Sequence, residues 1–285
     1  MNEQGKVLVT GATGKVGREV VTGLLERGVD FRALARDPDN ANLPDGVEVV
    51  RGDLTNPDAL ENALESVGVV FLLWAADDSY APAAVEEISR HANRIVYLSS
   101  EGVRDDLDEG SDQITSSHAN MERLIEASGL EWTFLRPTGF ASNTLGWAED
   151  IRTDGVARAP FGEARRPLIH ERDIAAVAVH ALTEEDHKGK KYILTGPESL
   201  AQSEQARLIG EAIGRPVRWE ETSRDDAREG LIAAFGDASA ADGVLNAWEG
   251  FITNPEPVTD TVEEITGKKA LTFRKWAEDH ADDFR

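Results

Sequence analysis

The sequence predicts an α/β protein with a doubly wound parallel sheet, followed by a smaller and mostly helical C-terminal lobe. Three observations indicate this class. Short β-branched segments alternate with amphipathic segments over the first half, one central strand is almost wholly apolar, and a glycine-rich turn joins the first strand to the first helix. The 285 residues suffice for one large domain or two small ones.

Strand and helix patterns alternate along the first half of the chain. Strands are predicted at 6–10, 31–35, 47–50, 69–73, 95–99 and 133–136, and helices at 16–27, from 57 onward, at 83–91 and at 119–128. The segment 69–73 has no polar alternation, which is typical of a strand that helices cover on both faces. The order of elements therefore predicts a parallel sheet.

The alternation weakens after Pro137. Helices are predicted at 173–182 and 203–213, strands at 191–194 and 217–220, and mostly helical structure over 224–285. This second half is expected to form a smaller lobe over the carboxyl ends of the strands, where such sheets bind ligands.

Charge and composition exclude several classes of protein. The chain has 53 acidic and 30 basic residues, a net charge of −23, and no cysteine. Such a charge repels nucleic acids and anionic lipids, and the absence of cysteine excludes disulfides and cysteine-ligated zinc. The longest apolar run, at 67–76, is too short to cross a membrane. We expect a cytoplasmic monomer or homodimer without a membrane or nucleic-acid partner, and no metal site, because the acidic run 105–109 is interpreted as a solvated loop.

The strongest local signal is TGATGKVG at residues 10–17. It follows a predicted strand and opens a predicted helix, as a dinucleotide-binding turn must. In such a turn Gly11 allows the tight bend, Gly14 leaves room for a pyrophosphate, and Gly17 lets the helix pack on the sheet. Amides at the helix start then bind the phosphates. The predicted cofactor contacts here are Gly11, Thr13, Gly14, Lys15, Val16 and Gly17.

The end of the second strand distinguishes NAD from NADP. An acidic residue there binds a ribose hydroxyl, whereas an arginine suits a 2′-phosphate. This sequence has Arg36 at that place, with Arg32 earlier and Asp37 directly after. We favour NADP(H) over NAD(H), with Asp37 as the residue that would reach a ribose hydroxyl instead. After the third strand, Asp53 is predicted to accept from the adenine amino group or to cap its own loop, and Leu54 lies beside it.

These signals assign roles to the two parts of the chain. We predict an NADP-binding Rossmann core from residues 1–140 together with about 166–198. We predict a substrate lobe from about 141–165 together with 199–285.

Several segments resemble the NmrA-like, atypical group of short-chain dehydrogenase/reductases. Besides the glycine turn, these are SGLEWTFLRP at 128–137, ERDIA at 171–175, LTGP at 194–197, and the ending from 262 to 277. The resemblance covers essentially the whole chain and implies the Rossmann fold with a nicotinamide dinucleotide. The group includes quinone oxidoreductases, dye and ketone reductases, and redox-sensing regulators.

The sequence departs from the best-known short-chain dehydrogenases at their catalytic residues. Those enzymes use a serine with a tyrosine and a lysine four residues apart. Alignment on Gly129 puts Ile114 at the tyrosine position and His118 at the lysine position, while Ser100 stands where the serine is expected. His118 followed four residues later by Glu122 resembles the quinone oxidoreductase subgroup.

Ser100 and His118 are the predicted catalytic residues. A neutral His118 can donate to the nicotinamide ribose and a protonated one can supply a proton; alternatively, it bonds a main-chain group at the helix start. Ser100 either binds a substrate carbonyl or caps local amides. Glu122 either orients His118 or is a solvated helix charge, and we favour the solvated charge.

The resemblance also implies contacts near the nicotinamide. The loop after the sixth strand faces this ring in the group, so Pro137 and Phe140 are expected there. Trp74 and Ala75 follow the fourth strand and are expected to pass under the same cofactor.

Four aromatic residues of the lobe are predicted to line an apolar cleft for a quinone or aromatic polycycle, although each alone also suits core packing. They are Trp147, Phe161, Trp248 and Phe251.

Three functions compete at this point. The first is an NADPH-dependent reductase of an aromatic or polycyclic ketone or quinone, whose proton comes from water, His118, Ser100 or the substrate itself. The second is an NADP(H)-binding redox sensor without turnover, which the missing tyrosine favours. The third is sugar-nucleotide epimerisation, which the missing tyrosine base disfavours. We favour the reductase.

Overall fold

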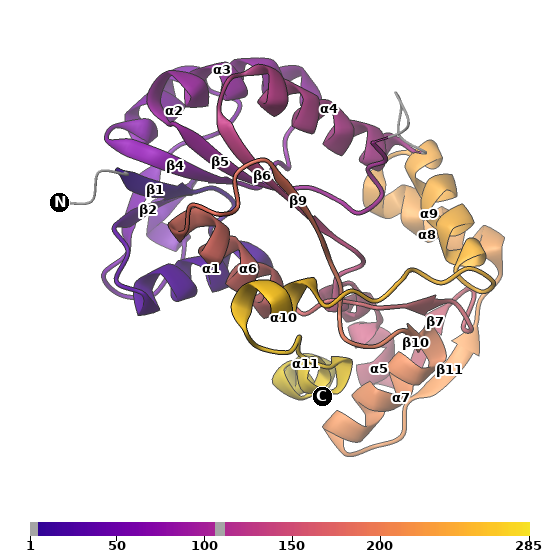
Figure 1. Cartoon of the computed structure of the whole chain (residues 1–285). Coiled ribbons are helices and arrows are strands. Elements are labelled where there is room, and N and C mark those ends of the chain that lie inside the picture. Colours follow the sequence, from indigo (N-terminus) through magenta and orange to yellow (C-terminus); the bar gives the residue numbers. More distant parts are fainter. Residues whose placement is uncertain (1–4, 106–111) are drawn as a thin grey trace. The chain divides into compact units, whose positions relative to one another are not determined.

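A seven-stranded sheet organises the first of two units into which the chain divides (Figure 1). The computed structural model describes residues 5–105 and 112–285. Unit 1 consists of residues 1–108, 117–137 and 171–193, and unit 2 of residues 109–116, 138–170 and 194–285.

The sheet of unit 1 has the order β3-β2-β1-β4-β5-β6-β9. Its strands are β1 (Lys6–Val9), β2 (Phe31–Ala35), β3 (Glu48–Arg51), β4 (Val67–Leu72), β5 (Arg94–Leu98), β6 (Glu131–Pro137) and β9 (Lys190–Leu194). All pairings from β3 across to β6 are parallel. Every residue of β4 is buried, as its apolar sequence predicts. The predicted α/β class with a doubly wound parallel sheet is confirmed.

Helices cover both faces of this sheet. They are α1 (Lys15–Glu26), α2 (Pro57–Leu64), α3 (Ala81–His91), α4 (Gln113–Ala127) and α6 (Glu171–Thr183), with short 3-10 turns η1 (Pro38–Asn40) and η2 (Asp78–Tyr80). Figure 1 shows α2, α3 and α4 along one face and α1 with α6 along the other. A buried apolar cluster under α2, α3 and α4 includes Leu60, Ile88, Tyr97, Met121 and Phe134.

Helix α4 begins six residues before the predicted start at 119. The side chain of Asp112 accepts hydrogen bonds from the main-chain N–H and the hydroxyl of Thr115, both at 2.9 Å. This is the geometry of a helix N-cap, which satisfies amides that the first turn leaves without partners. The first turns carry mainly polar residues, so apolar periodicity alone located only the later part of the helix.

Unit 2 contains short strands and the remaining helices. Its elements are η3 (Ala141–Trp147), α5 (Ala148–Asp154), β7 (Val156–Ala159), β8 (Arg165–Arg166), β10 (Leu200–Ala201), α7 (Gln202–Ile213), β11 (Arg218–Glu221), α8 (Arg224–Phe235), α9 (Ala238–Gly250), α10 (Thr261–Thr266), α11 (Phe273–Asp279) and η4 (Ala281–Phe284). Strand β7 pairs with β11 in parallel, and β8 pairs with β10 in antiparallel. The predicted helical character of 224–285 is confirmed, whereas strands β7, β8 and β10 were not predicted.

The core of unit 2 centres on aromatic side chains near the chain end. Trp276 and Phe284 are fully buried and pack with Phe273, Ile151 and Ile209. Within the described parts of the chain, none of the helices has the length and apolar character that crossing a membrane demands.

Candidate functional site

The glycine-rich turn has the backbone geometry of a dinucleotide-binding loop. Gly11 has φ +61°, a conformation that residues with a Cβ rarely adopt. A Cβ at Gly17 would lie 2.1 Å from the carbonyl oxygen of Gly11, so the start of α1 can approach the turn this closely only with glycine. Gly14 donates from its N–H to the Gly11 carbonyl at 2.9 Å, which closes the turn.

The start of α1 fits a phosphate group. Gly14 is the N-cap residue, no side chain caps the helix, and its first turn contains no acidic residue. Thr13, Gly14 and Lys15 are exposed, whereas Val16 and Gly17 are buried against the sheet. The amides and the positive end of the helix dipole are therefore available to an anion at this place. The residues present thus fit the pyrophosphate of a dinucleotide.

Arg18 is a structural residue of this loop that the sequence reasoning missed. Its guanidinium donates to the carbonyl oxygens of Thr13 at 2.9 Å and Ala41 at 2.8 Å, and also to that of Asn42. It therefore ties the glycine turn to the segment after β2. No local motif marks this role, because two of the three partners, Ala41 and Asn42, lie 23 and 24 residues away in sequence.

Two arginines lie near the ends of β2 and β3. Arg36, predicted to bind a 2′-phosphate, is exposed. Arg51 ends the neighbouring strand and donates to the Arg36 carbonyl at 2.7 Å, and its guanidinium lies 3.9 Å from the carboxylates of Asp37 and Asp39. Arg32 points elsewhere, because it donates to main-chain carbonyls near the end of α2 and pairs with a carboxylate on β3.

Asp53 caps its own loop. One carboxylate oxygen accepts from the N–H and the hydroxyl of Thr55, both at 2.9 Å. These bonds, first that of the amide and then that of the hydroxyl, lower the pKa of Asp53, and the charge of Arg36 lowers it further. The Asp53 carboxylate therefore interacts favourably with the charge of Arg36. Leu54, beside it, packs against the apolar cluster of unit 1.

Trp74 and Ala75 follow β4. Trp74 packs within the same apolar cluster, and in the described part of the chain its buried indole N–H has no hydrogen-bond partner. Ala75 is exposed. A buried donor without a partner is rare in folded proteins, and an acceptor atom of a ligand would satisfy it.

Ser100 is half-buried and lies two residues after the end of β5. Its hydroxyl oxygen accepts from the N–H of Gly102 at 3.2 Å, and its carbonyl accepts from Val103. The side chain therefore caps its own loop, the local role considered above, while the hydroxyl proton is available to another acceptor.

His118 lies on α4, facing the end of β5. Its Nδ1 is 2.7 Å from the hydroxyl of Tyr97, and the two ring centroids are 5.9 Å apart. The side chain of Tyr97 is only 1% exposed. Burial raises the pKa of Tyr97, and the nearby carboxylates of Glu122 and Asp78 raise it further. The sequence reasoning missed Tyr97, although its alternation with Ser99 places both on one face of β5.

The expectation that Glu122 is a solvated helix charge is wrong. Glu122 is 3% exposed, and both of its carboxylate oxygens accept from Arg136, at 2.6 and 2.9 Å. The hydroxyl of Ser99 donates to the same carboxylate at 2.5 Å. A buried carboxylate needs such compensation, and here Arg136, near the end of β6, supplies the charge.

Arg136 also holds the loop that contains Ser100. It donates to both carboxylate oxygens of Asp105, at 2.8 and 3.3 Å, and Lys191 reaches the same carboxylate at 2.8 Å. These hydrogen bonds, first that of Arg136, lower the pKa of Asp105 to about 2. The acidic run at 105–109 thus begins with a paired residue, and its other members lie outside the described residues.

The loop after β6 crosses from one unit to the other. Pro137 ends β6 in unit 1, and its carbonyl accepts from the N–H of Glu101 at 3.0 Å, which fixes the neighbourhood of Ser100. Phe140 belongs to unit 2, is half-buried, and forms a parallel bridge with Ile169.

The four predicted substrate aromatics lie in unit 2. Trp147 packs edge to face with Trp219 on β11, with centroids 5.5 Å apart, and Trp219 donates to Glu221 at 2.7 Å. The N–H of Phe161 donates to the same carboxylate, so the structure joins Trp147 and Phe161 through β11.

Trp248 and Phe251 lie on α9 and directly after it. The guanidinium of Arg166 stacks 4.8 Å above the ring of Phe251 and is held by both carboxylate oxygens of Glu256. All four aromatics are half-buried, so part of each ring contacts protein and part is accessible.

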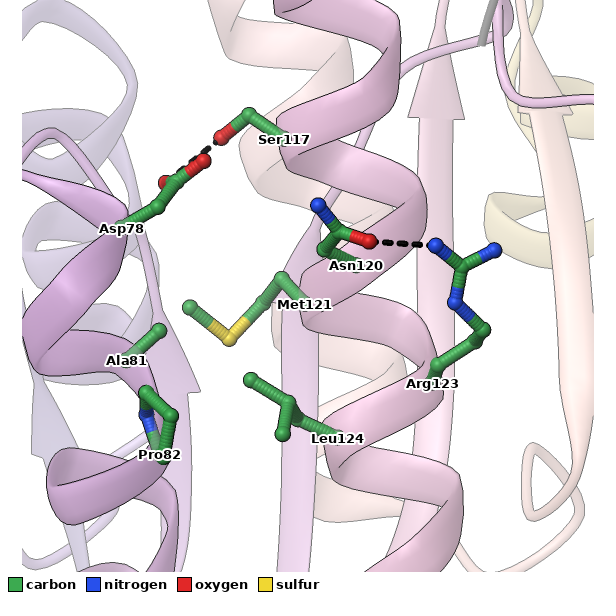
Figure 2. Close-up of a pocket in the computed structure, with 8 residues that line it drawn as sticks. All are labelled: Asp78, Ala81, Pro82, Ser117, Asn120, Met121, Arg123 and Leu124. Atoms are coloured by element: carbon green, nitrogen blue, oxygen red, sulfur yellow. Dashed lines mark hydrogen bonds between the residues drawn. The ribbon is translucent and has the colours of Figure 1, made fainter. Parts of the chain in front are cut away.

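Two cavities in the described part of unit 1 lie outside the predicted contacts. One, of about 360 Å³, lies between α3 and α4, with an apolar floor that includes Met121 and Leu124. Figure 2 shows Asp78 and Ser117 meeting across it. The other, of about 530 Å³, is polar and includes Arg94 at the start of β5 and Glu131 at the start of β6.

Comparison with known proteins gives consistent results. A model of the NAD(P)H-binding family matches residues 11–185. The chain is 40% identical over 285 residues to (4-alkanoyl-5-oxo-2,5-dihydrofuran-3-yl)methyl phosphate reductase of Streptomyces griseus, a match covering 98% of this chain and 99% of the relative. It is 34% identical over 285 residues to NAD(P)H azoreductase of Xenophilus azovorans, with the same coverage.

Solved structures share the fold at lower identity. The NADPH-dependent quinone oxidoreductase of Escherichia coli in complex with NADPH superposes with a TM-score of 0.79 at 22% identity, covering 96% of this chain and 99% of the other. The triphenylmethane reductase of Citrobacter in complex with NADP(H) gives 0.78 at 21% identity, with coverages of 97% and 99%.

Proposed function

Because the chain belongs to the NAD(P)H-binding family, as an NmrA-like atypical short-chain dehydrogenase/reductase, and is an NAD(P)H-dependent oxidoreductase, we propose that it uses NADPH to reduce an aromatic or polycyclic ketone or quinone. The single observation that carries this proposal is the junction of β5 and α4. Ser100 lies just after β5 and His118 lies on α4 near the end of β5, and hydrogen bonds from Tyr97, Ser99 and Arg136 hold these two segments in place.

The glycine turn is the proposed pyrophosphate site. The helix start without a side-chain cap supports this assignment, as does the close approach that Gly17 permits. Trp74, Ala75, Pro137 and Phe140 are the proposed contacts for the nicotinamide half. When bound, NADPH supplies the hydride that carries both electrons of the reduction.

The preference for NADPH rests on the corner formed by β2 and β3. Arg36 is exposed there, and Arg51 ends the adjacent strand and bonds the Arg36 carbonyl. Two guanidinium groups at one corner suit a phosphate dianion better than a ribose hydroxyl. Asp53, whose second carboxylate oxygen is not used by Thr55, is the proposed acceptor for the adenine amino group.

The substrate proposal combines three observations. Ser100 and His118 can each donate a hydrogen bond to a carbonyl oxygen. The accessible parts of Trp147, Phe161, Trp248 and Phe251 suit a flat apolar ring system. Finally, a quinone or a hydroxyl-flanked ketone stabilises its own developing oxyanion, so its reduction is compatible with the absence of the usual tyrosine and lysine pair. The relatives named as azo and quinone reductases support this class.

The proposal is tested by titrating the full chain with NADPH and NADH and then adding quinones and aryl ketones while absorbance at 340 nm is followed. We expect tighter binding of NADPH, followed by loss of absorbance with at least one carbonyl compound. Tight NADPH binding without any turnover across the panel would contradict the proposed substrate class. Equal affinity for both cofactors would contradict the preference for NADPH.

A further inference from the structure

Three side chains that can ligate a metal meet where helices α2 and α3 pack together in unit 1. Glu61 lies on α2, and Glu87 and His91 lie one helical turn apart on α3. One ligand atom of each residue, a carboxylate oxygen or a ring nitrogen, lies within 4.8 Å of the other two. In the described parts of the chain, no other group of three acidic or histidine side chains is this compact.

Glu87 and His91 already have the separation of neighbouring ligands. Nε2 of His91 lies 3.0 Å from Oε1 of Glu87. Two atoms that are each about 2.1 Å from one ion, at octahedral or tetrahedral angles, are about 3.0–3.4 Å apart. An ion can therefore take the place of the proton that joins these two atoms, without a change in the backbone of α3.

Glu87 is the fixed member of the group. It is only 6% exposed, and its second carboxylate oxygen, Oε2, accepts from Arg90 at 2.7 Å. Arg90 in turn pairs with Glu86. The bond to Arg90 holds the carboxylate in one orientation and leaves Oε1 directed at His91, in the way that hydrogen bonds orient ligating carboxylates in metal sites.

Glu61 adds a carboxylate that no cation neutralises within the described residues. It is exposed, and its side chain has no hydrogen bond or ion pair there. Its side chain can therefore rotate to close the remaining distance to an ion. The carboxylates of Glu61, Glu86 and Glu87 thus stand against the single guanidinium of Arg90. This excess of negative charge attracts a dication.

We propose that Glu61, Glu87 and His91 bind one divalent transition-metal ion of the Zn²⁺ type, which joins α2 to α3. One imidazole nitrogen with two carboxylate oxygens suits Zn²⁺, whereas Mg²⁺ prefers a shell of oxygens. Water molecules complete the coordination. The expectation of no metal site rested on the acidic run at 105–109, and these three residues lie elsewhere.

The position of the site indicates a structural role. Helix α3 ends at His91 and β5 begins at Arg94, so the site lies toward the amino ends of the parallel strands. The glycine turn lies at their carboxyl ends. An ion at this place links two helices and touches none of the proposed cofactor contacts. Because the ligands come together only in the folded chain, binding should stabilise the fold and be independent of NADPH.

The chain contains a matched control. His180 has a carboxylate partner at the same spacing as His91, since its Nδ1 lies 2.7 Å from Oε1 of Glu184. The guanidinium of Arg27 contacts the other ring nitrogen of His180. Within the described residues, no third acidic or histidine side chain brings an atom within 4.8 Å of both members of this pair. His180→Gln therefore removes a histidine from a similar pair without touching the proposed site.

The first measurement is calorimetric titration of the full chain with Zn²⁺ at neutral pH. Salt at about 0.15 M screens non-specific attraction to the net charge of −23. We expect one Zn²⁺ per chain in the unmodified protein and in His180→Gln. Affinity should fall about tenfold or more in His91→Gln and in Glu61→Gln, because each loses a ligand. Absence of saturable binding, unchanged affinity in either of these two variants, or an equal loss in His180→Gln would overturn the proposal.

The second measurement is the melting temperature, which also shows that the variants fold. Without metal, His91→Gln should melt within about 2 °C of the unmodified chain, since the replaced side chain is exposed. Zn²⁺ at about 100 times its Kd should raise the melting temperature of the unmodified chain and of His180→Gln by about 5 °C. It should leave His91→Gln unchanged. An equal rise in all three proteins would contradict the proposed site. Neither measurement involves NADPH, so both hold whatever the outcome for the reductase.

Discussion

Unit 1 contains two Tyr–His pairs, one at the edge formed by the carboxyl ends of its parallel strands and one at the edge formed by their amino ends. Tyr97 and His118 meet near the carboxyl end of β5. Tyr192 and His187 meet near the start of β6, where the His187 carbonyl accepts from Thr133 at 2.8 Å. The pairs are chemically alike, with distances of 2.7 and 2.9 Å between hydroxyl and Nδ1.

Their surroundings differ. The carboxyl edge has the glycine turn, Ser100 and the buried pair of Glu122 with Arg136, whereas the amino edge has an exposed ion pair of Lys188 with Glu131. The amino edge also has the larger of the two cavities described above. Neither a histidine bonded to a tyrosine nor a cavity distinguishes one region from the other. We propose the carboxyl edge as the functional one because the glycine turn, Ser100 and His118 lie there.

The largest difference between the edges should appear in stability. Arg136→Met leaves the Glu122 carboxylate buried without its partner, which should lower the free energy of unfolding by about 3–5 kcal/mol. Lys188→Met at the amino edge removes an exposed pair and should cost far less. Urea unfolding at pH 7 measures both. Equal losses for the two variants would contradict the burial difference.

The second difference should appear in catalysis. His118→Ala removes one of the two proposed donors to the substrate carbonyl and should lower kcat about 100-fold, with NADPH affinity retained. His187→Ala should lower the melting temperature and leave kcat near that of the unmodified chain. Stopped-flow mixing of the NADPH complex with substrate separates the effects on chemistry from those on binding. A similar kcat for His118→Ala and the unmodified chain would remove His118 from the reaction.

The third prediction compares two arginines of the same segment, Arg32 on β2 and Arg36 directly after it. Arg36→Ala should weaken NADPH binding about tenfold and leave NADH binding unchanged, because only the 2′-phosphate is bonded there. Arg32→Ala is the matched control, since Arg32 donates to the carbonyls of Ala63 and Glu65 and pairs with Glu48. It should affect both cofactors alike. Equal loss of NADH and NADPH binding in Arg36→Ala would exclude Arg36 from the phosphate site.

The smallest effect is a pH dependence at Asp105. Its pKa in the folded chain is about 2, below the ordinary value of 3.8, because Arg136 and Lys191 bond the ionised form. A lowered pKa stabilises the fold above the ordinary value, and this contribution is lost as pH falls from about 4 to about 2. Asp105→Asn should therefore melt slightly below the unmodified chain at pH 7, and the difference should narrow below pH 4. A difference independent of pH would refute this assignment.

The sequence was sufficient for features that depend on local spacing. The strands of unit 1 follow from apolar runs, and the glycine turn follows from the separation of Gly11, Gly14 and Gly17, because each constrains a contiguous stretch of chain. The fold class follows from the order of these elements.

Contacts between distant segments could not be read in this way. Within its own helix, Glu122 resembles a surface charge. Its partner Arg136 lies on a different element, the strand β6, where it stands among apolar residues. Tyr97 resembles an ordinary strand residue until α4 is placed over β5. Such pairings depend on the rotation and height of a helix on the sheet, which spacing along the chain does not determine.

The most direct test of the account is hydrogen exchange of the full chain with and without saturating NADPH, read by mass spectrometry. We predict slower exchange in peptides covering residues 10–17 and 35–37, and unchanged exchange at residues 128–131 and 185–188 around the amino-edge cavity. Protection confined to the amino edge, or none at either edge under saturation, would contradict the assignment of the carboxyl edge as the functional one.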